Sequence, residues 1–523
     1  MILRRYAAIL ALTLSVTTAA AAQQSSIDSR LDGFDEYMTR LLETWNVAGI
    51  GVGVVVKQKL VFAKGYGHRD YGKKLPYTPT TTQPIASNTK LFTAVAAGLL
   101  VEDGQLDWDK PIRTYVPSIK FSSDELDRTV TMRDMLSHRT GITGHNGIWY
   151  KSDFTQKDIF DRLRYLDPSA PPRTSFLYNN VMYSGAGHVI ELLGGKPWQT
   201  VVTERILRPL GMTNTTFTIA DMLRSPEAAV PYSERRSDDV LYRNSYYSDN
   251  VGLAPAAAMN SSVVDLSHWL IALMNGGVYN GTRVIPRDVL AETLAPAIAL
   301  PNTELDSQGW SELLNSAYGM GRWTAVYRGH LIAYHGGIIR GFQSQVSMMP
   351  NDSIGVIVMA IGDHAASLPS VVSWNLYERL LGLPLTPWSE RLNFIRLVNK
   401  KATAVARAAR DRRPANTTAS HPLADYVGEF EHPAYGDLTI SQANRALVFG
   451  FHKIRLPLSH VHYDRFDTPE DEEDGKWSVN FLRNASGEVD RAEMPVDGTV
   501  IVFKRRPLTA LSSVAAPRQQ SGK

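Results

Sequence analysis

A largely apolar run of ten residues near position 90 restricts the possible folds of this chain more than any other stretch. Within residues 91–100, Leu91, Val95 and Leu99 recur at four-residue spacing, which predicts a helix buried in a core. Gly104 supports a C-cap, so the helix is expected to end near residues 103–104. The remainder of the domain must therefore be built around this helix.

A serine and a lysine stand at the beginning of this predicted helix. Ser87 lies at or near the first turn, and Lys90 lies one turn further on the same face. A helix N-terminus stabilises a developing oxyanion, and a lysine with a lowered pKa can take a proton from serine. Two interpretations remain open: an acyl-transfer site, or an N-cap serine followed by a surface lysine. An isolated Ser-x-x-Lys favours the second.

Composition limits the class of protein. The chain has 523 residues, which exceeds one hydrophobic core and predicts two domains. Apolar residues make up 44% and charged residues 20%, as in soluble globular proteins, and the net charge of +3 gives no indication of a nucleic-acid partner. No cysteine is present, which excludes disulfides, thiol nucleophiles and thiolate metal sites.

The two ends of the chain differ from its middle. Residues 1–22 combine Arg4 and Arg5 with a short apolar run and three alanines before Gln23, which predicts a secretory signal peptide. An uncleaved N-terminal anchor is the alternative. No later segment has the length of a transmembrane helix. We therefore expect a secreted or periplasmic protein without an integral membrane segment after signal removal, and a disordered tail over residues 507–523.

Residues 23–390 predict one α+β domain. A helix at 27–45 and a hairpin at 50–66 come first, residues 105–220 are helical and rich in loops, and β-type periodicity returns after residue 317. We expect the strands of both ends to share one antiparallel sheet flanked by helices, with a mostly helical inserted section. The later strands are predicted at 318–323, 331–335, 342–349 and 354–360, and the last helix at 371–381.

The C-terminal part is organised differently. Residues 391–422 form a basic helical linker, either a membrane-surface or partner-binding face or, as we favour, a solvated connecting helix. Short alternating segments within residues 423–506 predict a small all-β barrel or sandwich, with strands that include 426–429 and 460–466. His460 and His462 share a strand face and could bind zinc, but no third ligand is evident, so packing or surface roles are favoured.

Two further clusters carry chemically useful side chains. In Tyr178-Asn179-Asn180, a tyrosine near a lysine could act as a phenolate base, and an asparagine amide could hold the lysine and a substrate carbonyl. In His335-Gly336-Gly337, the glycines would let a substrate approach a strand edge, and the histidine could donate to an anion or assist proton transfer.

The order Ser-x-x-Lys, Tyr-x-Asn, His-x-Gly resembles the serine β-lactamase and penicillin-binding protein family, in particular its class C-like branch. The flanking stretches at 104–107, 136–141, 209–212 and 318–321 agree with this resemblance, which covers roughly residues 27–385. His138 falls in one of these stretches, where a structural role is favoured. The C-terminal unit resembles the lipocalin-like β domain often appended to such hydrolases.

The resemblance implies roles for eight residues, and it implies neither a metal nor a cofactor. Ser87 is the expected nucleophile and Lys90 its general base. Tyr178 is expected to share the proton transfer and to protonate the leaving group, and Asn180 to orient Lys90 and the acyl amide. His335 takes the place of the third-motif cation, and Gly336 and Gly337 border the substrate. The backbone N–H groups of Ile338 and Ser87 are expected to form the oxyanion hole.

The implied activity is that of a serine hydrolase with an acyl-serine intermediate. A peptidase for small or unusual peptides, including D-residue-containing ones as in DD-peptidases, is the leading expectation. His335 supports this choice, because many β-lactamases carry lysine at that position. A carboxylesterase or β-lactamase on the same site is the alternative, an acyltransferase is a further option, and a non-catalytic penicillin-binding-like sensor is the remaining class. The substrate and the oligomeric state do not follow from the sequence.

Overall fold

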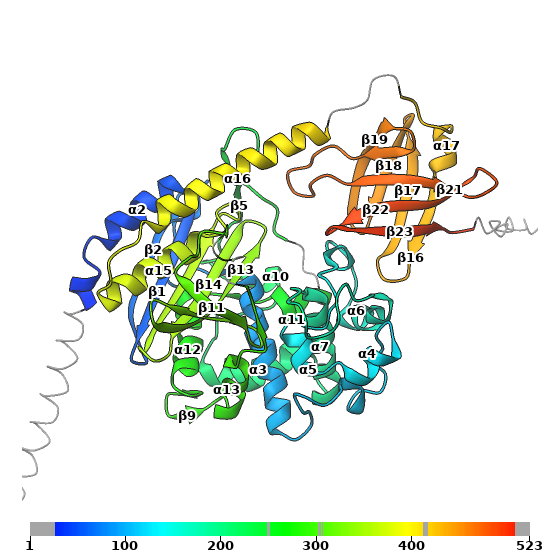
Figure 1. The fold of residues 1–523 in the computed structure, drawn as a ribbon. Helices are drawn as coiled ribbons and strands as arrows, with labels where there is room; N and C mark the ends of the chain where they lie inside the picture. The colour runs from blue at the N-terminus through cyan, green and yellow to red at the C-terminus, as the bar shows by residue number, and fades with distance from the viewer. Residues whose placement is uncertain (1–26, 248–250, 302–304, 306, 412–416, 508–523) are drawn as a thin grey trace, which may run out of the picture. The chain divides into compact units, whose positions relative to one another are not determined.

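The structure, a computed structural model, describes residues 27–247, 251–301, 305, 307–411 and 417–507 (Figure 1). The predicted signal peptide at 1–22 lies outside these residues, as does the predicted tail from residue 508 on. The chain divides into two compact units, residues 1–411 and 412–523, which are described separately below.

The first unit is built on a nine-stranded antiparallel sheet in which both ends of the unit take part. The strand order is β10-β11-β12-β13-β14-β15-β1-β2-β3, so the N-terminal hairpin lies directly beside the last strand, β15. This confirms the predicted α+β architecture. The strands are β1 (Gly49–Val56), β2 (Lys59–Asp70), β3 (Leu75–Pro76), β10 (Ile298–Ala299), β11 (Leu313–Tyr318), β12 (Trp323–Tyr327), β13 (His330–Ile339), β14 (Phe342–Met349) and β15 (Ile354–Ile361).

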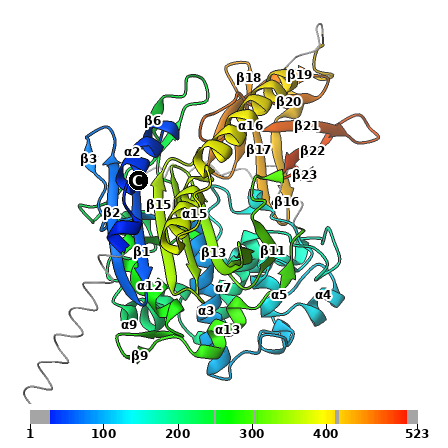
Figure 2. The ribbon, with the colours of Figure 1, turned by 60° about the vertical axis from the view of Figure 1, so that its left-hand side comes forward.

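Helices cover both faces of this sheet because its central strands are apolar on both sides. On one face, Ile50, Val52 and Val54 pack in a core with Phe34 of α2 (Phe34–Thr44) and Trp374 of α15 (Leu368–Leu381). On the other face, Gly51 and Gly53 lie against Val263 of α12 (Val263–Met274), where a side chain on either glycine would collide. Figure 2 shows α15 in front of the strands.

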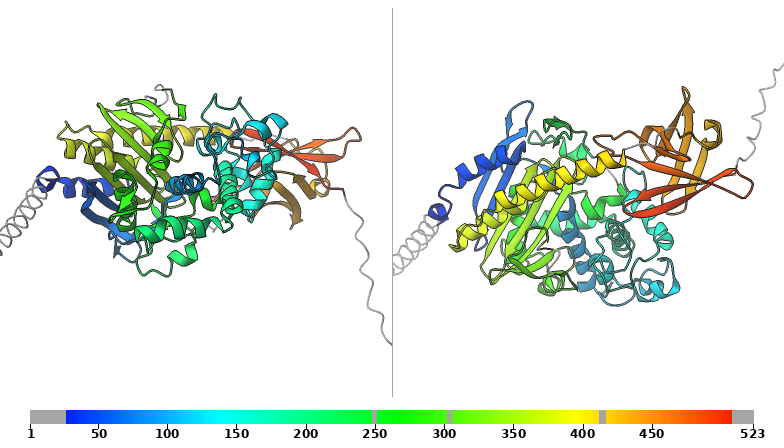
Figure 3. Two further views of the ribbon diagram at one scale, coloured as in Figure 1. Left: turned by 90° about the horizontal axis from the view of Figure 1, so that it is seen from below. Right: turned by 45° about the horizontal axis from the view of Figure 1, so that its top comes forward.

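The helical section inserted between β3 and β10 holds the predicted apolar helix. This helix is α3 (Thr89–Glu102), and its residues are buried from Thr89 to Leu100, which confirms the prediction. It packs against α7, α11 and α13 and lies between the sheet and the other helices (Figure 3, left). The remaining helices of this section are α4 (Asp124–Thr129), α5 (Met132–Leu136), α6 (Gln156–Arg162), α7 (Asn180–Gly194), α8 (Trp198–Val202), α9 (Arg208–Leu210), α10 (Ile219–Met222), α11 (Ala254–Ala257) and α13 (Arg287–Leu294).

The prediction of a strand at 318–323 is wrong, because a turn separates β11 from β12 there. Gly321 has φ +80°, and a Cβ on Gly319 would lie 2.5 Å from the carbonyl oxygen of Thr293. These glycines let the turn approach neighbouring backbone, which a regular strand could not do. The predicted helix at 27–45 is likewise interrupted, since Gly33 adopts φ +72° directly before α2.

A long helix, α16 (Trp388–Arg410), ends the first unit. Trp388 and Leu392 are buried at its beginning, and Arg396 and Lys400 form ion pairs with Glu234. The predicted linker helix therefore begins before residue 391 and packs on the first unit up to that ion-pair cluster. Among the described residues, no helix combines the length and apolar character needed to cross a membrane.

The second unit is a closed antiparallel barrel in which β16 pairs with β23, so the barrel alternative is confirmed over the sandwich. Six phenylalanines fill its interior: Phe430, Phe449, Phe451, Phe466, Phe481 and Phe503. Two predictions here are wrong: Tyr426 ends the short helix α17 (Leu423–Tyr426), and a turn at 463–464 divides the predicted strand 460–466. The strands are β16 (Gly428–His432), β17 (Gly436–Ala443), β18 (Ala446–Phe451), β19 (Ile454–His462), β20 (Arg465–Asp467), β21 (Ser478–Arg483), β22 (Val489–Val496) and β23 (Thr499–Arg505).

Candidate active site

Ser87 lies in a single 3-10 turn, Ala86–Asn88, directly before α3. Ala86 has φ 47°, a conformation that costs free energy for a residue with a side chain. Hydrogen bonds hold this turn in place, since the Ser344 hydroxyl donates to the carbonyl oxygen of Ile85 at 2.7 Å and accepts from the Asn88 amide at 2.8 Å. The N-cap of α3 is Asn88, and no side chain among the described residues caps this helix. The alternative of an N-cap serine is therefore wrong.

Lys90 is fully buried, which also rules out the surface-lysine alternative. Its Nζ lies 3.0 Å from Ser87 Oγ, 2.7 Å from Asn180 Oδ1 and 3.0 Å from the carbonyl oxygen of Ala256. No carboxylate is among these partners. Because burial without a counter-charge disfavours the ammonium form, the pKa of Lys90 falls well below its ordinary value.

The three partners of Lys90 determine where its lone pair points. A neutral amine has two hydrogens and one lone pair. The oxygens of Asn180 and Ala256 can only accept, so they take both hydrogens. The lone pair is left for the hydroxyl of Ser87, which can donate. Neutral Lys90 is thus placed to receive the proton of Ser87.

The orientation of the Asn180 amide follows from a chain of hydrogen bonds that the sequence did not reveal. The indole N–H of Trp149, which can only donate, lies 3.0 Å from Asn146 Oδ1. The same oxygen accepts from Asn180 Nδ2 at 3.2 Å, which turns Asn180 Oδ1 toward Lys90. Asn146 and Trp149 belong to none of the sequence motifs. Only the structure shows that they position the amide of Asn180.

Tyr178 lies next to this pair, with its ring centroid 4.8 Å from Lys90 Nζ. Burial raises the pKa of Tyr178, and a hydrogen bond with Ser87 opposes that rise only in part. The tyrosine is therefore a phenol, and the expectation of a phenolate base is wrong for the free protein. Below its ring, the buried His138 accepts a hydrogen bond from the backbone N–H of Asn179 at 3.0 Å, which supports the loop that carries Tyr178.

His335 is held as a neutral imidazole. Its Nδ1 lies 2.6 Å from the carbonyl oxygen of Gly336 and therefore carries the hydrogen, while Nε2 accepts from the Tyr318 hydroxyl at 3.0 Å. Burial lowers the pKa of His335 to about 3. The residue stands in the expected place, but it supplies no positive charge. Tyr318, the residue that fixes this tautomer, was seen in the sequence only as part of a flanking stretch.

The two glycines after His335 have different roles. The pairing of β12 with β13 ends at Tyr334, so among the described strands none pairs with that side of residues 335–339. Gly336 borders this open edge, where the nearest atom to an added Cβ is 3.9 Å away. At Gly337 a Cβ would lie 2.1 Å from the carbonyl oxygen of Ile85. The absence of a side chain at Gly337 therefore permits close packing against the Ser87 turn.

A cleft of about 380 Å³ brings the predicted residues together. Ser87 and the free edge of β13 both line it. Its lining includes Tyr178, Asn180, His335, Gly336, Gly337 and Ile338. Apart from the buried Lys90 behind Ser87, every residue predicted from the three motifs thus lines one cavity. Among the described residues, no three metal-ligating side chains gather into a group, so His460 and His462 have no third ligand there.

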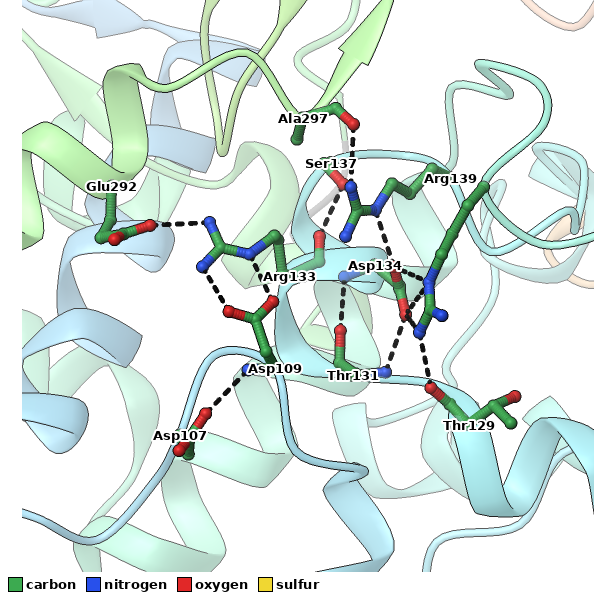
Figure 4. Close-up of polar contacts among 11 residues, drawn as sticks. Asp107, Asp109, Thr129, Thr131, Arg133, Asp134, Ser137, Arg139, Glu292 and Ala297 are labelled. Atoms are coloured by element: carbon green, nitrogen blue, oxygen red, sulfur yellow. Dashed lines mark hydrogen bonds and ion pairs between the residues drawn. The ribbon is translucent and has the colours of Figure 1, made fainter.

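Ion pairs around Asp134 and Arg133 connect α5 to the segments on either side of it (Figure 4). Asp134, fully buried in the capped helix α5, accepts from Arg139 at 2.7 Å and from Arg173 at 2.7 Å. Arg139 follows His138 directly, and Arg173 lies in the loop that leads to Tyr178. Burial raises the pKa of Asp134, but the hydrogen bonds and charges of the two arginines outweigh this and lower it.

Comparison with known proteins agrees with this geometry. The Beta-lactamase family model matches residues 34–373, more than half of the chain, and a domain of unknown function, DUF3471, matches residues 412–505. The unguisins hydrolase of Aspergillus violaceofuscus is 29% identical over 440 residues, 78% of this chain and 76% of that protein. Protein flp of Staphylococcus aureus strain N315 is 26% identical over 334 residues, 62% of each chain.

Solved structures show the same fold at low identity. The octameric penicillin-binding protein homologue from Pyrococcus abyssi superposes with a TM-score of 0.59 at 20% identity, covering 91% of this chain and 100% of that one. The D-amino acid amidase from Ochrobactrum anthropi SV3 superposes with a TM-score of 0.55 at 20% identity, covering 66% and 98%. This chain belongs to the beta-lactamase family and has the fold of its hydrolases.

Proposed function

We propose that this protein is an exported serine hydrolase that forms an acyl-Ser87 intermediate and cleaves amide bonds in small or unusual peptides. The observation that carries the proposal is the buried Lys90, which has no carboxylate partner within the described part of the chain and contacts Ser87 Oγ at 3.0 Å. Export rests on the signal-peptide pattern of residues 1–22.

The proposed reaction assigns each group one step. Ser87 Oγ attacks the substrate carbonyl and passes its proton to Lys90. The backbone N–H groups of Ser87 and Ile338 stabilise the tetrahedral oxyanion, and each such donor contributes about 3–4 kcal/mol to transition-state stabilisation. The phenol of Tyr178 protonates the leaving amine and regains a proton from Lys90, which returns to its neutral form. Water then hydrolyses the acyl-serine ester, giving the free acid and Ser87.

Two considerations favour amides over penicillins. The names of two similar proteins, an unguisins hydrolase and a D-amino acid amidase, refer to hydrolysis and to amide cleavage. In addition, the neutral His335 offers no cation to the carboxylate that every penicillin carries. Ester hydrolysis by the same groups is the second candidate, because an ester meets the same nucleophile and has a better leaving group.

We expect a fluorophosphonate probe to label the wild-type protein and to leave Ser87→Ala unlabelled. Only the serine hydroxyl can displace the fluoride, so the loss should be complete while the fold is retained. Gel fluorescence together with mass spectrometry of the labelled peptide gives the measurement. Equal labelling of Ser87→Ala would show that another residue is the nucleophile, and absence of labelling in the wild type would favour a non-catalytic sensor.

Gly337→Ala should slow this labelling strongly. The new Cβ would lie 2.1 Å from the carbonyl oxygen of Ile85 and 2.7 Å from Ser344 Oγ, so the turn that carries Ser87 must move. A displacement of about 1 Å at a reacting group costs about 10²-fold in rate. Gly336→Ala, whose Cβ meets no atom closer than 3.9 Å, should have a much smaller effect. Equal rates for the two variants would contradict the packing role assigned to Gly337.

A further inference from the structure

A second cavity, lined largely by aromatic side chains, adjoins the Ser87 cleft. It has a volume of about 380 Å³, and its walls include Phe176, Leu313, Trp323, Tyr334 and Trp374. We name it the aromatic pocket. None of the described residues that line it is charged. It shares Tyr178, Trp323 and Ser370 with the cleft, so the two cavities meet beside the nucleophile.

The rings of the aromatic pocket hold one another in place. The ring centroids of Phe176 and Trp323 lie 4.9 Å apart, and those of Tyr334 and Trp374 lie 5.7 Å apart. Trp374 also stacks on Tyr327 at 5.3 Å. Such a set of packed rings is a preformed apolar surface, and a volume of this size accommodates a phenyl or indole group.

Two buried donors at this place have no partner within the described part of the chain. Trp374 Nε1 belongs to a wall of the aromatic pocket, and Gln345 Nε2 belongs to a wall of the adjoining cleft. Trp374 is 1% exposed and Gln345 3% exposed. Because both donor atoms are themselves sealed from solvent, they belong to the dense packing behind the pocket wall and are not contact points for a ligand. The preformed, uncharged ring surface and its junction with the cleft are therefore what indicate a bound ligand.

The lining residues also indicate which side of the scissile bond faces the pocket. Tyr178, proposed above to protonate the leaving amine, lines both cavities. Asn180, expected to hold the acyl amide, lines the cleft but does not line the aromatic pocket. The pocket therefore extends from the leaving-group side of Ser87. Because Tyr178 reaches Ser87 by a hydrogen bond, the pocket begins within one substrate residue of the reacting carbonyl.

We propose that the aromatic pocket binds an uncharged aromatic side chain on the residue that supplies the leaving amine. The substrate class is thus a peptide with an aromatic residue directly after the scissile amide bond. This inference rests on the proposed acyl-Ser87 mechanism and specifies its substrate.

The amine site can be tested without the natural substrate. p-Nitrophenyl acetate would acetylate Ser87 with release of p-nitrophenol, and an added amine would then attack the acetyl carbonyl. The Ser87–acetyl bond breaks, an N-acetyl amide forms, and the amine proton returns to the enzyme. We would supply racemic phenylalaninamide and alaninamide in equal amounts and measure the two N-acetyl products by mass spectrometry.

The wild type should prefer phenylalaninamide by about 10- to 100-fold, as expected when one phenyl group enters an apolar pocket. Phe176→Ala and Trp310→Ala each remove a wall that belongs to the aromatic pocket and does not line the cleft, so the preference should fall toward 1. Phe394→Ala, which alters a phenylalanine 68% exposed on α16, should leave the preference unchanged.

The outcomes separate the two proposals. If acetyl-Ser87 forms but captures both amines equally, captures neither, or keeps its preference in both pocket variants, the aromatic pocket is not the amine site. If Ser87 is not acetylated at all, the acyl-enzyme mechanism itself fails, and the substrate assignment fails with it.

Discussion

Replacing Lys90 by methionine should slow acylation of Ser87 by about 10²- to 10⁴-fold, the usual contribution of a positioned general base. Methionine fills a similar volume but cannot take the serine proton. Burst kinetics with p-nitrophenyl acetate would measure the acylation rate directly. Lys110→Met, at a lysine side chain 64% exposed, is the matched control and should acylate like the wild type. A Lys90→Met protein that acylates within a few-fold of the wild type would exclude lysine from the proton transfer.

The pH dependence should identify the same group. Because burial lowers the pKa of Lys90, the amine is neutral over a wider pH range than an exposed lysine, and acylation should fall as the pH decreases through that lowered pKa. His335, with a pKa of about 3, remains neutral in this range and should not contribute a second step. If the acylation rate of Lys90→Met falls at low pH in the same way as that of the wild type, the titrating group is not Lys90.

The same substitution should stabilise the protein near neutral pH. The unfolded chain protonates this lysine below about pH 10.4, whereas the folded protein does so only when the pH falls below its lowered pKa. The unfolded state therefore binds more protons, and the burial of Lys90 lowers the free energy of unfolding as the pH falls below that value. Lys90→Met removes this penalty. Denaturant unfolding at pH 7 should show a higher midpoint for the inactive variant, and a lower midpoint would contradict the neutral, buried state.

The sequence could predict those parts of the site that depend on local pattern. The buried helix, the position of Ser87 before it and the hairpin at 50–66 follow from periodicity and turn residues, and strand β14 has the predicted bounds. The resemblance also identified the distant Tyr178 and His335, which the structure places in one cleft.

The features of the site that could not be predicted from the sequence depend on contacts between segments that are far apart in the chain. The neutral state of His335 depends on Tyr318, which β11 brings beside it, and the orientation of Asn180 depends on Asn146. At 318–323 the alternating pattern predicted a strand, yet Gly321 packs so close to the backbone of Lys90 and Leu91 that a turn forms instead. The spacing of apolar residues predicts which side chains are buried, but it does not predict such close contacts between backbone segments.

Asp134→Ala should clearly destabilise the protein, although the residue lies outside the catalytic cleft. It would leave the guanidinium groups of Arg139 and Arg173 without the carboxylate that they share. Because the Arg173 side chain is 48% exposed and the Arg139 side chain 16% exposed, we expect a cost of about 2–3 kcal/mol, below the value for a fully buried pair. Asp109→Ala is the matched control, because Asp109 pairs with Arg133 in the same region (Figure 4) but its side chain is 63% exposed. It should cost less than about 1 kcal/mol.

Tryptophan fluorescence during urea unfolding can measure this difference in stability. Nine of the ten tryptophans lie in the first unit and only Trp477 lies beyond residue 411, so the signal reports mainly on the unit that contains Asp134.

The pH dependence of the stabilisation by Asp134 has a definite sign. The pKa of Asp134 is lowered in the folded protein, so its stabilising contribution is complete above the unfolded-state pKa of about 3.9 and is lost as the pH falls through the lower folded value. The gap in stability between wild type and Asp134→Ala should therefore be constant near neutral pH and narrow only in strong acid. A gap that narrows already at mildly acidic pH, or equal costs for Asp134→Ala and Asp109→Ala, would mean that this carboxylate does not hold the loops of His138 and Tyr178.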